Sequence, residues 1–204
     1  MVEVYSAIYG GYDDIKKQVV DVKVFTEESG IALAEGLHPR MKAKMFKCNP
    51  HLFLDCDYSI WVDGSATIHD PNFVERCLDY LGDNELMCFV HPEGRRCIYE
   101  EAQYCKDFLK YKDVDIQGQM DIYRKQGYPE QNGLWACGLI VRKHTARVKR
   151  FNELWWEHNL KYTYQDQLSF PVVKDMVAPR FKTLWLNQHD NDLITFMTPH
   201  KSDL

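Results

Sequence analysis

The chain has 204 residues and a net charge of -5 at pH 7, with acidic and basic residues interspersed. The length fits one domain, expected over residues 1–204, and the charge pattern argues against a nucleic-acid-binding protein. The apolar runs are too short to span a membrane, and the first residues do not form a signal peptide. We therefore expect a cytoplasmic protein that is not secreted.

Seven cysteines are scattered along the chain without a Cys-x-x-Cys pair. An odd number at irregular spacing indicates neither a disulfide framework nor a zinc site. Free, buried thiols in a reducing compartment are expected.

The first predicted strand, residues 2–8, runs into a glycine turn at residues 9–14. The turn contains neither Gly-x-Gly-x-x-Gly nor a Walker loop, so neither a dinucleotide site nor a P-loop is supported. Backbone groups at Ala7 and Ile8, with Tyr9 as a stacking surface, would suit a nucleobase. The alternative is a plain β-turn with surface tyrosines. A second strand is expected at residues 19–26.

A helix is predicted at residues 39–48, because proline favours the first helical position. Arg40, Lys44 and Lys47 are spaced i, i+4 and i+7, so they share one face. That face would neutralise a diphosphate. The alternative, a solvated basic face, is favoured more for Lys47 than for Lys44.

The next predicted strand, within residues 58–65, ends in Asp63, Gly64 and Ser65. Ligands of open α/β sheets bind beyond the carboxyl ends of the strands, so Asp63 would meet a small molecule or a metal ion. Gly64 allows a sharp turn or a close approach of the backbone to a ligand. The alternative is a turn in which Asp63 bonds to its own backbone.

A helix with Asp70 as its N-cap is predicted over residues 70–82, followed by a strand at 85–90. His91, Arg95 and Arg96 come next, ahead of a helix at residues 100–112. These three side chains would suit an anionic ligand, and compensation of the acidic start of that helix is the alternative.

In the second half of the chain, Asn132 lies in a loop before a strand that Gly138 interrupts. A glycine inside a strand indicates that a ligand or another backbone approaches closely. Asp166 lies near a helix start, and His200 follows the last predicted strand. The remaining helices and strands are predicted at residues 116–126, 133–142, 144–158, 183–186 and 193–198.

Strands alternate with helices through most of the chain, which predicts an α/β fold with a mostly parallel sheet and helices on both faces. Polar residues follow the strand ends. Asp63, Ser65 and a histidine from a later strand end would suit Mg²⁺ or Mn²⁺, since both ions take oxygen ligands and Mn²⁺ also accepts imidazole.

Three segments carry a family resemblance. They are Tyr-Ser-Ile-Trp-Val-Asp-Gly-Ser (58–65), His-Pro-Glu-Gly-Arg-Arg-Cys-Ile-Tyr-Glu-Glu-Ala (91–102) and Gln-Asp-Gln-Leu-Ser-Phe (165–170). They resemble GT-A glycosyltransferase-like domains, related to a plant family formerly of unknown function and to virus-encoded domains that build capsid glycans. The resemblance implies a single Rossmann-like GT-A domain, a UDP-sugar donor, a glycan acceptor and a Mn²⁺ or Mg²⁺ ion on the diphosphate. It also implies further domains where such a chain is part of a longer polypeptide, and the host cytoplasm as the location if the chain is viral.

The resemblance also assigns roles to residues. Asp63 corresponds to the first acid of the Asp-x-Asp metal motif, and Ser65 stands where the second acid would be. His200 matches a C-terminal metal histidine, with His189 as the second choice. Asp166 occupies the position of the base in inverting enzymes, and capping of its helix is the alternative role. The donor contacts that the resemblance and these positions imply are Ala7, Ile8, Tyr9, Arg40, Lys44, Val62, Asp63, Gly64, Arg95, Asn132, Trp135, Cys137 and Gly138.

The expected activity is metal-dependent, inverting transfer of a glucose- or rhamnose-like hexose or deoxyhexose. A retaining transferase of the same fold is one alternative. A catalytically weak module that only binds the sugar nucleotide is another, and Ser65 favours it. A metal-dependent nucleotidyltransferase or phosphatase would need more clustered acids.

Overall fold

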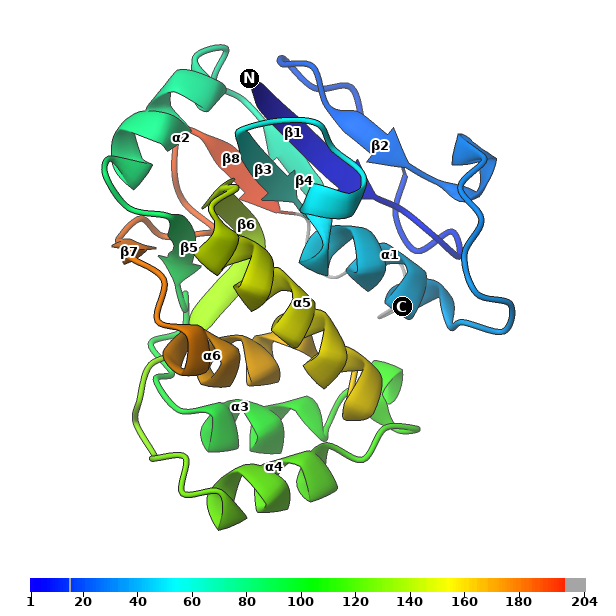
Figure 1. The fold of residues 1–204 in the computed structure, drawn as a ribbon, viewed down its shortest axis with the longest axis vertical. Helices are drawn as coiled ribbons and strands as arrows, with labels where there is room; N and C mark the ends of the chain where they lie inside the picture. Colours follow the sequence, from blue (N-terminus) through cyan, green and yellow to red (C-terminus); the bar gives the residue numbers. More distant parts are fainter. Residues whose placement is uncertain (15, 197–204) are drawn as a thin grey trace.

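The computed structural model describes residues 1–14 and 16–196, and its centre is a six-stranded sheet (Figure 1). Strand β6 is antiparallel to both of its neighbours, and the other three pairings in the sheet are parallel. The predicted mostly parallel sheet is therefore confirmed. In spatial order its strands are β2 (Lys23–Phe25), β1 (Val2–Ala7), β3 (Tyr58–Val62), β6 (Trp135–Lys143), β5 (Leu86–Val90) and β7 (Phe181–Leu184).

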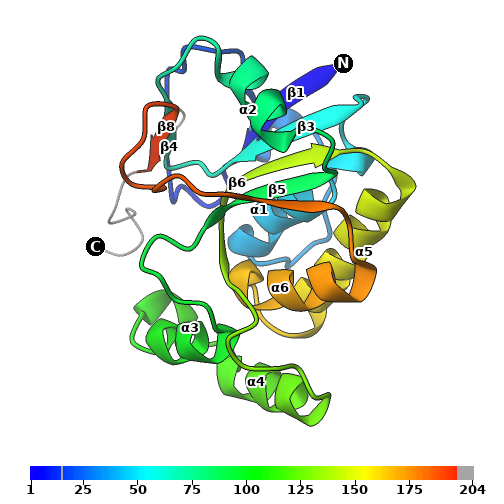
Figure 2. The same cartoon turned by 90° about the vertical axis from the view of Figure 1, so that its left-hand side faces the viewer.

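Helices cover both faces of this sheet, as predicted. Helix α2 (Phe73–Leu81) and a two-stranded sheet of β4 (Ala66–Ile68) and β8 (Ile194–Phe196) pack on one face. The other face is covered by α1 (Pro39–Cys48), α5 (Ala146–Lys161) and α6 (Asp166–Val177). Figure 2 shows α3 (Ile98–Cys105) and α4 (Ile116–Lys125) below the sheet, and they pack against α6. Three short 3-10 turns complete the elements: Glu27–Ser29, Pro50–Leu52 and Leu109–Tyr111.

The alternation of β3 explains how one short strand joins two cores. Ile60 and Val62 point to the core under α2, and Trp61 points to the core under α1 and α5. Successive side chains of a strand face opposite sides of the sheet, so a strand between two covered layers buries apolar residues on both faces. The consecutive apolar residues Ile60, Trp61 and Val62 are the consequence, and the buried Ser59 hydroxyl lies 2.8 Å from His144 Nε2.

Several predicted boundaries differ from the structure. The strand expected at residues 19–26 is only three residues long, Lys23–Phe25. Before it, the Gln18 side chain bonds Ala66 O at 3.0 Å and Ile68 N at 2.7 Å, beside β4. Asp70 does not cap α2: it accepts a bond from Asn72 N at 2.8 Å, and the helix begins at Phe73. The helix expected at residues 100–112 is divided between α3 and the 3-10 turn Leu109–Tyr111.

The cysteines have the state expected from the sequence. All seven cysteines are free, and all but the half-buried Cys56 are buried. Within residues 1–14 and 16–196, no helix combines the length and apolar character that crossing a membrane requires.

Candidate functional site

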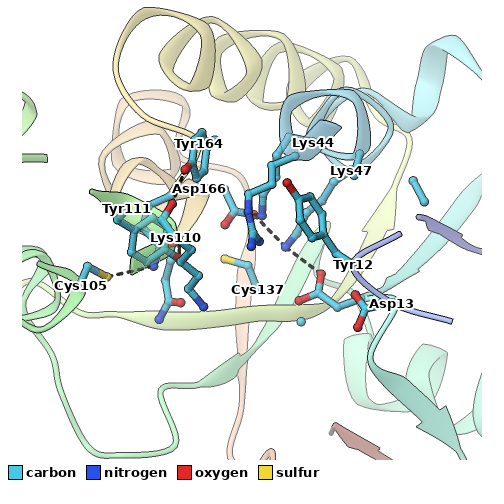
Figure 3. A pocket seen from close by; sticks show the side chains of 18 of the residues that line it. Tyr12, Asp13, Lys44, Lys47, Cys105, Lys110, Tyr111, Cys137, Tyr164 and Asp166 are labelled. Atoms are coloured by element: carbon cyan, nitrogen blue, oxygen red, sulfur yellow. Dashed lines mark hydrogen bonds and ion pairs between the residues drawn. The ribbon is translucent and has the colours of Figure 1, made fainter. Parts of the chain in front are cut away.

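A cavity of about 310 Å³ opens beyond the carboxyl ends of β1 and β3. Its floor includes Cys137 and Gly138 of β6, and α1 and the start of α6 supply ionised side chains. Residues 101–111 form the opposite wall. Figure 3 shows Lys44 and Lys47 reaching from α1 toward Asp166, with Tyr111 and Tyr164 beyond it. Segments that are far apart in sequence therefore meet at one site.

The basic face of α1 is directed into this cavity. Arg40, Lys44 and Lys47 all line it, as their spacing predicts. The Arg40 guanidinium lies 4.3 Å from the centre of the Tyr12 ring. The expectation that a solvated position suits Lys47 better than Lys44 was wrong, since the Lys47 side chain is 2% exposed and that of Lys44 is 21% exposed.

Lys47 connects the two carboxylates that the sequence singled out. Its Nζ lies 3.0 Å from Asp63 Oδ1 and 2.8 Å from Asp166 Oδ2, and Lys44 Nζ lies 2.9 Å from the same Asp166 oxygen. Burial disfavours the charge on Lys47, but Asp166 and Asp63 outweigh this effect and raise its pKa. Burial likewise opposes the charge on Asp166, and Lys44 and Lys47 outweigh it and lower its pKa to about 2. Lys47 and Asp166 are therefore both ionised at neutral pH.

Asp63 follows β3 directly and begins a turn, in which its backbone oxygen accepts a bond from Ala66 N at 2.9 Å, but its carboxylate is held by other side chains. Its Oδ1 accepts bonds from Trp61 Nε1 at 2.7 Å and from Lys47 Nζ at 3.0 Å. Its Oδ2 accepts no hydrogen bond from the described residues, and the side chain is 34% exposed. One carboxylate oxygen thus remains available to a ligand in the cavity.

Gly64 lies where β1, the following turn and β3 converge. A Cβ at this position would lie 2.9 Å from Ile8 Cγ1 and 3.1 Å from Asp13 Cβ. In β6, a Cβ on Gly138 would lie 2.8 Å from the Phe196 ring. The sequence predicted that a ligand or another backbone approaches Gly138 closely. On one side of Gly138 the neighbouring group is instead the Phe196 side chain of β8, and Gly138 also lines the cavity.

The metal-ligand set expected from the sequence is only partly assembled. Ser65 is buried, 1% exposed, and is not among the cavity-lining residues. His200 lies outside the described residues, and His189 is exposed. No group of three His, Cys, Asp or Glu side chains arranged for a metal occurs in the described parts of the chain. Asp63 can supply one oxygen, and Mg²⁺-type sites often take their remaining ligands from phosphates and water.

The predicted donor contacts divide into two sets. Ala7, Ile8, Tyr9, Arg40, Lys44, Asp63, Gly64, Cys137 and Gly138 line the cavity. Val62 lines a neighbouring cavity of about 230 Å³, which Asp63 and Gly64 also border. Tyr9 is 5% exposed and its ring stacks on Phe46, so little of its surface is left for a nucleobase.

Arg95, Asn132 and Trp135 do not line the cavity, and each has a partner elsewhere. Arg95 Nε lies 2.7 Å from Glu101 Oε2. This arginine therefore compensates the acidic start of the helix, which was the alternative considered from the sequence. Asn132 Nδ2 bonds Asp175 Oδ2 at 2.6 Å. Trp135 Nε1 bonds Thr183 Oγ1 at 3.0 Å.

Asp166 is the first residue of α6 but does not cap it. The N-cap position is Gln165, and no side chain bonds the free backbone groups there. The carboxylate points instead to the two lysines of α1. The capping role, the alternative considered from the sequence, is therefore wrong.

Several cavity residues were not predicted from the sequence. Lys47 was named but assigned to the surface. Tyr164 was noted only as an aromatic neighbour of Asp166. Asp13 and Tyr111 were not predicted, and the packing that brings Tyr111 to the cavity has no local signal in the sequence.

Comparison with known proteins gives a consistent family assignment. Residues 37–198 match the TOD1/MUCI70, glycosyltransferase-like domain. The probable hexosyltransferase MUCI70 of Arabidopsis thaliana is 29% identical over 157 residues, which cover 72% of this chain and 26% of that protein. The alkaline ceramidase TOD1 of the same plant is 27% identical over 157 residues, covering 72% of this chain and 34% of that protein. The chain thus spans about a quarter to a third of the length of these relatives.

Solved structures also resemble the chain. The apo structure of the bifunctional glycosyltransferase WbbM is similar over 90% of this chain and 38% of its own, with 14% identity and a TM-score of 0.45. The galactosyltransferase LgtC in complex with donor and acceptor sugar analogs is similar over 90% of this chain and 73% of its own, with 12% identity and a TM-score of 0.45.

Proposed function

The chain belongs to the TOD1/MUCI70 glycosyltransferase-like domain family, and from this premise we propose that it transfers a hexose or deoxyhexose from a UDP-sugar to a glycan acceptor. The observation that carries the proposal is the row of Arg40, Lys44 and Lys47, which meets Asp63 in one cavity at the strand ends. Bound ligands of open α/β sheets occupy this position.

The three cations suit the diphosphate of the donor. Charge-assisted hydrogen bonds from lysine and arginine to phosphate oxygens are short and strong. Each contributes about 1.5–3 kcal/mol. Arg40 and Lys44 are partly exposed and can contact a ligand directly, whereas Lys47 is buried and pairs with Asp63 and Asp166.

A divalent ion fits the same arrangement at Asp63. Its available oxygen would hold Mn²⁺ or Mg²⁺ together with the diphosphate, and the ion would neutralise charge that develops on the leaving nucleotide. Ser65 has no part in this proposal, because its side chain is buried outside the cavity.

Asp166 is proposed as the base that takes the proton of the acceptor hydroxyl, which gives inversion at the anomeric carbon. With both lysines on one of its oxygens the carboxylate is a weak base, since its pKa is about 2. An efficient base has a pKa closer to the working pH. A diphosphate that draws Lys44 toward itself would raise the pKa of Asp166, because it removes a neighbouring positive charge.

The test is UDP release from UDP-glucose, UDP-galactose and UDP-rhamnose, with and without MnCl₂, in the presence of a mixed glycan acceptor. We expect release from at least one donor, and loss of it in Lys44→Ala. UDP-sugar binding without any turnover would identify a sugar-nucleotide-binding module instead. Because one relative is named a ceramidase, a parallel assay with ceramide should give no hydrolysis.

A further inference from the structure

We define the cationic wall as Arg40, Lys44 and Lys47 of α1. The opposite wall of the cavity differs from it in chemistry. It is built by residues 104–111 and by the start of α6. We define the aromatic wall as Tyr104, Phe108, Tyr111, Tyr164 and Gln167, all of which line the cavity. Figure 3 shows Tyr111 and Tyr164 on the far side of Asp166 from Tyr12 and Asp13.

Two rings of this wall are held in place by their own hydroxyl groups. Tyr111 Oη donates to Gln165 Oε1 at 2.9 Å, and Tyr164 Oη donates to the backbone oxygen of Lys110. The His38 ring stacks on Tyr164 with centres 5.3 Å apart and planes at 7°. Because these two hydroxyls are used within the protein and Phe108 has none, the wall presents ring surface to the cavity. A ring face attracts the weakly positive C–H edges of a ligand.

Two glutamines that line the cavity have side-chain groups without hydrogen-bond partners among the described residues. Gln188 Oε1 is buried and accepts no hydrogen bond from the residues that the structure describes. The Gln167 side chain also has no partner among those residues. A buried acceptor without a donor costs free energy, and a ligand hydroxyl would remove that cost. Together the two amides can both donate to and accept from hydroxyl groups.

The ionised groups near the wall already have contacts within the protein, including the Arg95 guanidinium, which lies 4.0 Å from the centre of the Tyr104 ring. The Glu101 carboxylate is buried and lies 2.7 Å from Arg95 Nε. Lys110 Nζ lies over the rings of Phe108 and Tyr111, at 5.2 Å and 5.3 Å from their centres. The site therefore offers ring surface and amides to a ligand, which suits an uncharged one.

We propose that the aromatic wall is the acceptor subsite and that it binds a neutral pyranose at the end of a glycan. The apolar face of the sugar lies on the rings, and its hydroxyls bond the amides of Gln167 and Gln188. Asp166 lies between this wall and the cationic wall, so a hydroxyl of the bound sugar is placed beside its carboxylate. The inference rests on the proposed function, because it takes the cationic wall as the donor half.

The test is ligand-observed NMR of the domain saturated with UDP, which occupies the donor half. The probes are the methyl pyranosides of glucose, galactose, mannose, xylose and rhamnose, with methyl glucuronide as the acidic comparison. At least one neutral glycoside should bind more tightly than the glucuronide. Phe108→Leu, which keeps an apolar side chain but removes the ring, should weaken that binding by about tenfold. Gln167→Ala should weaken it about 3- to 10-fold.

A control at an aromatic residue outside the cavity makes the result specific. Trp185→Leu removes an aromatic side chain that is 72% exposed and outside the cavity, and it should have no effect. The inference is overturned if no neutral glycoside binds, if the glucuronide binds best, or if Phe108→Leu and Gln167→Ala bind normally. Failure of UDP itself to bind would instead contradict the proposed function.

Discussion

Lys47 Nζ lies 2.8 Å from Asp166 Oδ2, and this buried ion pair joins α1 to the first turn of α6. The same ammonium group lies 3.0 Å from Asp63 Oδ1 at the end of β3. One side chain therefore fixes the relative positions of the donor-side carboxylate and the proposed base. A buried charge that loses its partner is costly, so this contact also affects folding.

Lys47→Met should destabilise the protein by about 3–5 kcal/mol, because it leaves the buried Asp166 with one cation in place of two. Urea unfolding of the variant measures this loss. Lys42→Met, on the same helix but away from the cavity, is the matched control and should change stability little. Equal stability of the two variants would show that the Lys47 ion pairs are not structurally important.

Asp166→Asn should lower the rate of sugar transfer by about 10²–10⁴-fold while UDP binding is preserved, because a carboxamide cannot take up the proton. The measurements are single-turnover transfer and NMR of the anomeric configuration of the product. An unchanged rate would rule out Asp166 as the base. Retention of the donor configuration in the product would exclude inversion.

Asp63→Asn should remove the part of UDP-sugar affinity that depends on Mn²⁺, since the available carboxylate oxygen is replaced by a weaker ligand. Calorimetric titration with and without MnCl₂ measures the difference. Ser65→Ala should leave the metal dependence unchanged, because Ser65 is buried and does not line the cavity. A metal response that survives in Asp63→Asn and disappears in Ser65→Ala would reverse the assignment.

Stability should decrease as the pH falls from 6.5 toward 4, and His144 is one cause. Burial lowers the pKa of His144 from 6.5 to about 4, and one of its ring nitrogens lies 2.8 Å from Ser59 Oγ. Between these values the unfolded chain binds a proton that the folded protein does not, so acid favours unfolding. His144→Gln should reduce the slope of unfolding free energy against pH in this window.

The control for this prediction is His189→Gln, since His189 is exposed. It should leave the slope as it is in the unaltered protein. A slope that is the same in His144→Gln and His189→Gln would mean that His144 does not contribute. Below pH 4, protonation of Asp166 should remove further stability as the pH approaches its pKa of about 2.

The local features of the site were predictable from sequence, and the contacts between elements were not. The i, i+4, i+7 spacing placed Arg40, Lys44 and Lys47 on one face, and the end of an apolar strand placed Asp63 at the sheet edge. Burial of Lys47 depends on α6, which brings Asp166 to α1 from the other half of the chain. No local pattern encodes that contact.

The same distinction explains the residues that were misplaced. Arg95 has the same sequence signature as a phosphate ligand, but Glu101 lies six residues further along the chain and pairs with it. The aromatic wall was missed because its rings come from two segments, residues 104–111 and Tyr164, that meet only when α3 packs on α6. Ser65 follows a strand end but turns into the core.

In the proposed function, the cationic wall binds the diphosphate of a nucleotide sugar. Isothermal titration with UDP in the presence of MnCl₂ measures this binding, with Lys44→Ala as the site variant and the exposed Arg96→Ala, outside the cavity, as the control. We expect the unaltered protein and Arg96→Ala to bind UDP equally, and Lys44→Ala to bind at least about tenfold more weakly. Absence of UDP binding to the unaltered protein, or equal affinity in Lys44→Ala, would contradict it.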